Sequence, residues 1–464
     1  MAISHGQIEP QVTNELANAP RYSLELSLAD DLTSVTGVQT VAVTNTTNDI
    51  LDELYFHLHP NLIGGEFTIT QLSLAGIETD ITFNDAQTLL QVTLPGGLFP
   101  GEVATVSLTY SLRVPQVMGR NYGILSLQEG ILSLPHAYAI LAVFDEASNT
   151  WDIDSPPNHG DLVYSDTAFY NVTLHGPVGA VIVSSGQTLS REVTTNRQTL
   201  QVEAGPARDF YVSASFDYEV LRAEVGLANG NVVGINSYYQ PRSDTHKQRA
   251  EEVLEHTIDA LELLSGSLAP YPYSEFDIVP MVTSALGLEF PGIIGLSTNL
   301  YEDVNIGRLP SQAYLESTVV HEVVHQWFYN LVGSDQVSEP WLDEATTQYL
   351  TLQYFRQHYG PRSGPAQAFR NGLEGRRHSV FTERKVGQAV ADYSSREYGA
   401  IVYGLGPLVL VDLADLIGEE VLMGFFREYT LQNAWQRVDG EEFEEQLEAY
   451  CNCVLDEFFE TWVR

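Results

Sequence analysis

The stretch VVHEVVHQWFYN, from Val319 to Asn330, constrains the fold most, because it sets two histidines four residues apart within an apolar run. Residues four apart lie on one face of an α-helix, so His321 and His325 present their imidazoles side by side, at a separation that suits one tetrahedral metal ion. Glu322 lies next to that face, where its carboxylate can take a proton from a metal-bound water. The stretch therefore predicts a buried helix that carries a metal site.

A catalytic zinc site usually takes three protein ligands and leaves one position open, so a third ligand is expected downstream. The segment SEPWLDEATTQYL supplies Glu344, on a second helix predicted from about Glu339 to His358. Two helices joined by a short connection can pack antiparallel and direct this carboxylate at the histidine pair. His321, His325 and Glu344 are the predicted ligands of one Zn²⁺ ion per chain.

The two parts of the chain have different hydrophobic periods. Residues 1–217 contain short runs with a period of two, such as YSLELSLA and EVATVSLTYSLRV, separated by Gly, Asn, Asp and Pro, which predicts antiparallel sheets in a sandwich or saddle. Residues 218–464 are mostly helical in pattern, and FDIVPMV is predicted to be a strand. A chain of 464 residues exceeds one ordinary domain, so we expect an α+β protein with an all-β domain followed by a catalytic domain.

Composition excludes some partners. The formal charge of -39 repels nucleic acid and anionic membranes. We expect no membrane span, because the longest apolar run, residues 399–411, ends at Asp412 and is shorter than the roughly 18 residues that a span needs. The N-terminus MAISHGQIEP has neither the basic nor the apolar segment of a signal peptide. Cys451 and Cys453 are one residue apart, which is poor spacing for a disulfide, so free thiols are expected.

The sequences HEVVHQW and WLDEA resemble the paired motifs HExxHxW and WLNEG of the zinc aminopeptidases in the gluzincin group, peptidase family M1. Asp343 and Ala345 stand where the family pattern has Asn and Gly, outside the ligand set. The resemblance implies a saddle-shaped β domain and a thermolysin-like zinc domain, without the helical C-terminal domain that many members carry. Similar short bacterial proteins are often exported, which favours the cell envelope or exterior for a soluble protein of this kind.

Two further segments resemble family motifs. In YGLGPLVLVDLADLIG, Tyr403 matches the tyrosine that stabilises the developing oxyanion, whereas Tyr393 and Tyr398 lack the glycine three residues on. In ALGLEFPG, Glu289 matches the glutamate of GxMEN, which binds the free α-amine of the substrate. The two residues before it, Gly287 and Leu288, are expected to contact substrate as well.

The resemblance implies a zinc aminopeptidase that acts on peptides with a free N-terminus, in which Glu322 activates the zinc-bound water. Two alternatives stay open on the sequence alone. A zinc endopeptidase, or another zinc hydrolase, uses the same HExxH ligands with a downstream glutamate. The second alternative is that the chain is a noncatalytic peptide-binding protein with the same fold. The sequence does not determine the oligomeric state or the preferred first residue.

Overall fold

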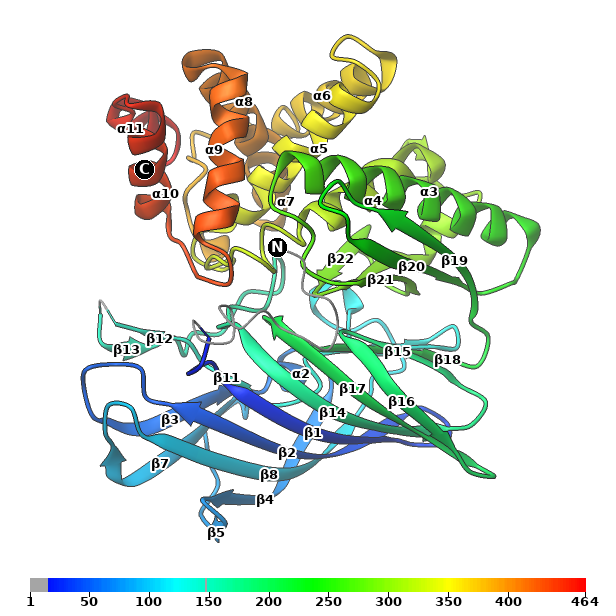
Figure 1. The fold of residues 1–464 in the computed structure, drawn as a ribbon, viewed down its shortest axis with the longest axis vertical. Coiled ribbons are helices and arrows are strands. Elements are labelled where there is room, and N and C mark those ends of the chain that lie inside the picture. Colours follow the sequence, from blue (N-terminus) through cyan, green and yellow to red (C-terminus); the bar gives the residue numbers. More distant parts are fainter. Residues whose placement is uncertain (1–15, 147) are drawn as a thin grey trace.

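The computed structural model describes residues 16–146 and 148–464, in a lower part built of strands and an upper part built mainly of helices (Figure 1). The stretch MAISHGQIEP, for which no signal peptide is predicted, lies outside the described residues. The combination of a sheet domain and a helical domain confirms the predicted fold class.

The largest sheet of the lower part follows the predicted period of two. In β1, Tyr22, Leu24, Leu26 and Leu28 are buried and the residues between them face outward. Burying one such leucine contributes roughly 1.5–3 kcal/mol. In spatial order the strands are β16 (Gln187–Val193), β17 (Arg197–Ala207), β14 (Ala168–Pro177), β1 (Arg21–Leu28), β2 (Ser34–Thr44), β8 (Val103–Arg113), β4 (Glu66–Leu74) and β5 (Ile77–Glu78).

One pair in this sheet departs from the antiparallel prediction. β1 runs parallel to β14, with Arg21 beside Phe169. The chain forms β2 to β13 between these two strands, and a long connection of this kind permits parallel pairing, which a short hairpin does not.

Two four-stranded sheets and a short hairpin complete the β domain. One sheet consists of β15 (Val181–Ser184), β18 (Tyr211–Ser215), β10 (Ile131–Pro135) and β9 (Ser126–Gln128). The other consists of β11 (Ile140–Leu141), β3 (Leu51–His57), β7 (Leu89–Leu98) and β6 (Thr82–Phe83). The hairpin pairs β12 (Phe144–Asp145) with β13 (Thr150–Trp151), and the short helices are α2 (His59–Leu62) and η1 (Asn121–Gly123).

The helical part begins with a five-stranded sheet. Its strands are β19 (Glu219–Gly226), β20 (Val232–Tyr239), β21 (Glu275–Met281), β23 (Ile293–Ser297) and β22 (Gly287–Phe290). Side chains of Met281, Phe290 and Ile293 belong to the same apolar cluster as the β-domain core. The two parts therefore share packed core, and the residues between them are held in place.

The remaining elements form the helical layer above this sheet. They are α3 (Asp244–Ser267), η2 (Thr298–Tyr301), β24 (Asn305–Ile306), β25 (Leu309–Pro310), α4 (Gln312–Val324), η3 (Trp341–Ala345), α5 (Thr346–His358), α6 (Gly364–Arg377), η4 (Val390–Asp392), α7 (Ser395–Ala400), η5 (Ile401–Leu405), α8 (Gly406–Ile417), α9 (Glu419–Gln432), α10 (Gly440–Cys451) and α11 (Asp456–Trp462).

Helix α4 is shorter than the apolar run that predicts it. It ends at Val324, and His325 caps it with helical backbone angles. The residues that follow form turns, with Tyr329 at φ 109° and the Asn330 N–H donating to the His325 carbonyl at 3.1 Å. The apolar residues after His325 are buried in these turns, so hydrophobicity continues where the helix does not.

Among the described residues, Ser395–Ile417 is long and apolar enough to cross a bilayer, with a mean hydropathy of 1.9. Of its most apolar window, 67% is buried inside the fold. The continuous helix is thus longer than the predicted apolar run of residues 399–411, and it is mostly buried, as the core helix of a globular domain is.

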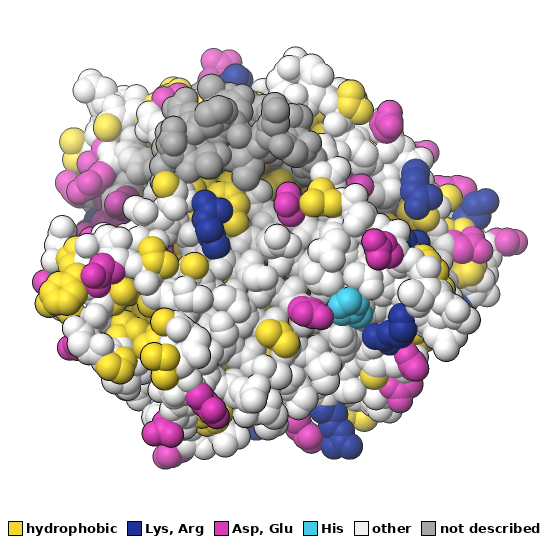
Figure 2. All heavy atoms as spheres, turned by 60° about the horizontal axis from the view of Figure 1, so that its bottom comes forward, with side chains coloured by type: hydrophobic (Ala, Val, Ile, Leu, Met, Phe, Trp, Pro, Cys, Tyr) yellow, Lys and Arg dark blue, Asp and Glu magenta, His cyan; other side chains and the backbone are white. Residues whose placement is uncertain are grey.

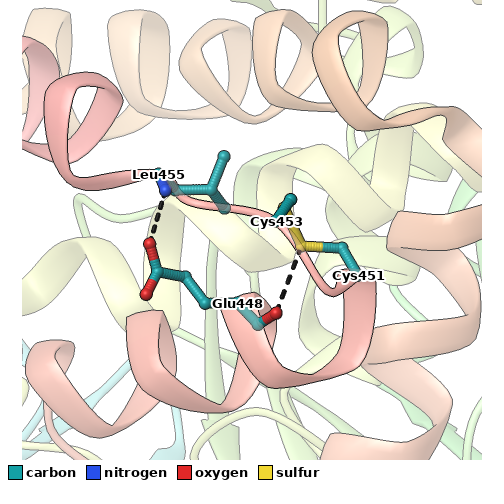
Figure 3. Close-up of a disulfide and its surroundings, with 4 residues drawn as sticks. All are labelled: Glu448, Cys451, Cys453 and Leu455. Carbon is teal, nitrogen blue, oxygen red and sulfur yellow. Dashed lines mark hydrogen bonds between the residues drawn. A yellow bond between two sulfur atoms is a disulfide. The ribbon is translucent and has the colours of Figure 1, made fainter.

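The expectation of free thiols is wrong, because Cys451 and Cys453 form a disulfide with a Cα–Cα distance of 5.2 Å (Figure 3). Helix α10 ends at Cys451, and Asn452 adopts a left-handed conformation with φ 50°. This reversal turns the two side chains toward each other, and the Glu448 carboxylate accepts from the Leu455 N–H to hold the turn (Figure 3).

The face of the molecule shown in Figure 2 carries scattered acidic side chains and few basic ones. Most of this face is white, which marks backbone and uncharged polar side chains. Acidic and basic side chains are interspersed on the part of this face that the described residues form.

Candidate metal centre

Helix α4 carries the two histidines of the HExxH segment to one end of a cavity, which His321 lines. The His321 and His325 Nε2 atoms lie 3.2 Å apart, and the two rings are nearly perpendicular at 89°. His325 is fully buried and His321 is 9% exposed. The spacing of four residues thus directs both Nε2 atoms at one point.

Glu344 reaches the same point from η3, a π-helical turn that precedes α5. Its Oε2 atom lies 3.2 Å from His321 Nε2 and 3.6 Å from His325 Nε2. Such π-helical turns occur frequently at functional sites. One ligand atom from each of the three residues lies within 4.8 Å of the other two, so the structure brings the predicted ligands together.

Asp343 orients the second histidine. Its Oδ1 atom lies 2.7 Å from His325 Nδ1, which leaves His325 Nε2 to face Glu344 and His321. The Gln336 side-chain amide donates to the other Asp343 oxygen. A metal-binding histidine commonly donates its second ring N–H to a carboxylate in this way.

The polar atoms at this point fit a cation. Glu344 Oε2 is buried and makes no hydrogen bond, although two imidazoles approach it. Burial acts to raise the pKa of Glu344, but the nearby imidazoles of His321 and His325 hold it below the usual value, so the carboxylate is ionised. Burial opposes protonation of His325, yet Asp343 and Glu289 raise its pKa well above the usual value. The site therefore attracts positive charge, and its donor set of two imidazoles and one carboxylate is that of a zinc site.

Glu322 lies beside the ligands and does not belong to their group. Its side chain is 3% exposed, its Oε2 atom has no hydrogen-bond partner, and it lies close to Glu289 and His325. Burial, reinforced by the charge of Glu289, raises the pKa of Glu322 well above the usual value. Gly287 makes room for this carboxylate, because a Cβ atom at Gly287 would overlap it.

Tyr403 approaches Glu344 from η5. Its hydroxyl donates to Glu344 Oε1, and its ring lies 5.6 Å from that of Tyr398. Burial raises the pKa of Tyr403 well above the usual value, so the phenol remains a hydrogen-bond donor. Tyr393 points elsewhere, with its hydroxyl donating to the Lys385 and Val386 carbonyls.

Glu289 lies on β22 and is 9% exposed. Burial raises the pKa of Glu289 to about 8, although the charge of His325 opposes this. One carboxylate oxygen of Asp161, from the β domain, lies within 4.8 Å of one from Glu289 and one from Asp343. Leu288 and Gly287 of the same strand line the adjoining space.

His321, Glu322, Glu344, Glu289 and Tyr403 border one cavity of about 680 Å³ between the β domain and the helices, whereas His325 and Asp343 do not line it. Its β-domain wall includes Tyr122 and Asp161. No local sequence pattern distinguishes Asp161 or Tyr122, and the family motif indicates Asp343 only as a residue outside the ligand set. The position of Asp343 within WLDEA, directly before Glu344, was the available signal for it.

Comparisons with known proteins show which family this chain resembles. The Peptidase family M1 domain profile matches residues 252–462, which include all the residues described on α4, η3, η5 and β22. Aminopeptidase M1 from Arabidopsis thaliana is 22% identical over 306 residues, covering 64% of this chain and 34% of the relative. Leukotriene A-4 hydrolase from Xenopus laevis is 24% identical over 242 residues, covering 50% of this chain and 38% of the relative. The matched region thus spans about a third of the length of these relatives.

The fold is also that of a solved structure over nearly its whole length. The M1 zinc metallopeptidase from Deinococcus radiodurans superposes with a TM-score of 0.69 at 18% identity, covering 96% of this chain and 93% of that one. Both domains therefore have their counterpart in a single known architecture.

Proposed function

Because the chain belongs to peptidase family M1, we propose that it is a zinc aminopeptidase, which removes the N-terminal residue from peptides. One observation carries the proposal: His321, His325 and Glu344 converge on one point, with the Glu322 carboxylate beside them in the same cavity as Glu289. A ligand triad with an adjacent unpartnered carboxylate is the arrangement that metal-assisted hydrolysis requires.

His321, His325 and Glu344 would hold one zinc ion per chain. When bound, zinc supplies a Lewis acid that polarises the carbonyl and makes water acidic enough to attack at neutral pH. The neutral imidazole that this requires of His321 is favoured, because burial lowers the pKa of His321.

Glu322 moves the proton. Its carboxylate accepts a proton from the attacking water and then passes it to the amine that leaves when the peptide bond breaks. The group is suited to this exchange because it is buried and its Oε2 atom has no competing partner.

Tyr403 stabilises negative charge on the carbonyl oxygen. In the structure its hydroxyl donates to the predicted metal ligand Glu344, and the same donor can turn to a substrate oxygen. Removal of one oxyanion-hole donor from a serine protease costs about 2.7–4 kcal/mol, which sets the scale for such a donor.

Glu289 determines which peptide bond is cleaved, because it binds the free α-amine of the substrate. A carboxylate and an ammonium form a charge-assisted hydrogen bond, which restricts cleavage to the first peptide bond. A two-domain M1 zinc metallopeptidase of the same fold has been solved with bound L-tryptophan and with bound L-arginine, with TM-scores of 0.70 and 0.72. Binding of free amino acids in that relative supports an amine site of this kind here.

The test is hydrolysis of paired aminoacyl anilides, one free and one N-acetylated, over several side chains, with chelator and with zinc restored. We expect cleavage of the free-amine member alone, lost on chelation and regained with zinc. Cleavage of the acetylated member would keep the zinc chemistry and reject the exopeptidase assignment. A protein that binds zinc and cleaves neither member would be a noncatalytic member of the family.

We also propose that the protein works in the cell envelope or outside the cell, because a disulfide such as Cys451–Cys453 persists in oxidising compartments. Thiol labelling of the protein taken from the source cells tests this. Recovery of both cysteines in the reduced form from a cytosolic fraction would contradict it.

A further inference from the structure

The cavity beside the metal centre has an acidic side and a basic side. Asp161, Glu289 and Glu322 line it from the β domain, β22 and α4. Arg376 and Arg396 line it from the end of α6 and the beginning of α7, where they are exposed to the cavity. A substrate bound here therefore meets charge of both signs.

Tyr403 separates the two sides. Its hydroxyl contacts the predicted metal ligand Glu344, while the Arg376 guanidinium carbon lies over its ring, 6.0 Å from the centroid. Glu289 belongs instead to a group with Glu322 and the ligand His325, and to a second group with Asp161 and Asp343. Successive contacts thus lead from Glu289 through the metal ligands to Tyr403 and then to Arg376.

Neither arginine is neutralised by the protein. Among the described residues, no carboxylate oxygen lies within 4.0 Å of the Arg376 or Arg396 side-chain nitrogens, in a chain with 61 acidic and 22 basic residues. The Arg376 backbone is fixed, because its carbonyl accepts from the Ser379 N–H at 2.9 Å and the Ser379 hydroxyl at 2.6 Å. The guanidinium keeps its donors for a ligand, and its planar fork matches a carboxylate.

We propose that Arg376, assisted by Arg396, binds a carboxylate of the substrate on the C-terminal side of the bond that is cleaved. The inference rests on the proposed function, since an amine at Glu289 and a carbonyl at the metal centre make the peptide run on toward Tyr403 and Arg376. A cavity of about 680 Å³ is of the size that holds a small ligand. The carboxylate is supplied either by the C-terminus of a short peptide or by an acidic side chain in the second or third residue.

The experiment measures kcat/KM of zinc-loaded protein for three kinds of tripeptide. The first has a free C-terminal carboxylate, the second is the same tripeptide with an amidated C-terminus, and the third is an amidated tripeptide with Glu as its second or third residue. The first residue is the one that gives the fastest anilide hydrolysis. We expect the acid, or a Glu-containing amide, to have a kcat/KM at least tenfold above that of the plain amide, expressed mainly in KM. A faster acid identifies the C-terminus as the source, and a faster Glu-containing amide identifies the side chain.

Arg376→Gln should bring the ratio between carboxylate-bearing and plain amide substrates to about one, while Arg377→Gln should leave it unchanged. Arg377 is the matched control, because it is the next residue of α6 and does not line the cavity. Equal kcat/KM for all the tripeptides in the wild-type protein, with anilides still cleaved, would overturn this inference and leave the aminopeptidase assignment intact. If anilides are not cleaved, equilibrium binding of the same peptides to zinc-loaded Glu322→Gln decides, and equal affinities overturn the inference.

Discussion

Asp343 Oδ1 lies 2.7 Å from His325 Nδ1, with both side chains fully buried. This contact fixes the ring so that its Nε2 atom faces Glu344 and His321. Asp343→Ala should therefore lower zinc affinity about 10–100-fold, the usual effect of removing such a partner. Asp343→Asn should lower it less, because an amide oxygen still accepts from Nδ1. Chelator competition at fixed pH measures both.

Asp392→Ala is the control for this measurement, since Asp392 is exposed and outside the cavity. We expect its zinc affinity to equal that of the unmodified protein. If Asp343→Ala also bound zinc as tightly as the unmodified protein, the orienting role of Asp343 would be rejected.

Glu322→Gln should reduce kcat by about 10²–10⁴-fold, because the amide cannot accept the proton of the attacking water. Zinc content should remain one per chain, since Glu322 is not among the three converging ligands. Elemental analysis and anilide kinetics on the same preparation check both points. Glu316→Gln is the matched control on α4, because Glu316 accepts from the Tyr354 and Tyr359 hydroxyls, away from the site. Retained activity in Glu322→Gln would disprove its role as the base.

The sequence predicts the elements of this fold where one local rule decides the structure. The alternation in β1 and the four-residue histidine spacing on α4 each depend on a single period, and both are observed. Asp161 could not be predicted, because its place beside Glu289 depends on how the β domain packs against β22. The π-helical turns at Glu344 and Tyr403 could not be predicted either, since their hydrophobic pattern is that of an ordinary helix.

The disulfide, too, could not be predicted from the sequence. A spacing of one intervening residue disfavours Cys451–Cys453 only if the backbone stays regular. The left-handed Asn452 removes that condition, and sequence spacing alone does not reveal it.

Tyr403→Phe should lower kcat about 10²–10³-fold and change KM little, because the lost hydroxyl acts on charge that develops during the reaction. Tyr393→Phe should keep kcat, since its hydroxyl donates to backbone carbonyls outside the cavity. Tyr398 borders the cavity and its hydroxyl is buried without a partner, which makes Tyr398→Phe the discriminating comparison. A large kcat loss in Tyr398→Phe, with none in Tyr403→Phe, would transfer the oxyanion role to Tyr398.

The stability of the catalytic domain should depend on the protonation of Asp277 in β21. Burial, reinforced by the charge of Glu275, raises the pKa of Asp277 well above its usual value, although the Asn236 side chain donates to it at 2.8 Å. The folded protein thus holds a proton that the unfolded chain releases near pH 4, so this group lowers stability progressively as the pH rises from about 4 through the folded-state pKa.

Asp277→Asn removes this ionisation and keeps an oxygen to accept from Asn236. Its melting temperature should exceed that of the unmodified protein by a few degrees at pH 8, since about 1 kcal/mol corresponds to roughly 2–4 °C in chains of 150–250 residues. The difference should shrink as the pH falls toward 5, because the native Asp277 then keeps its proton at less cost. Melting curves of the two proteins at pH 5 and pH 8, with Asp392→Asn as the exposed control, measure it. A difference that is the same at both pH values would show that Asp277 does not titrate in this range.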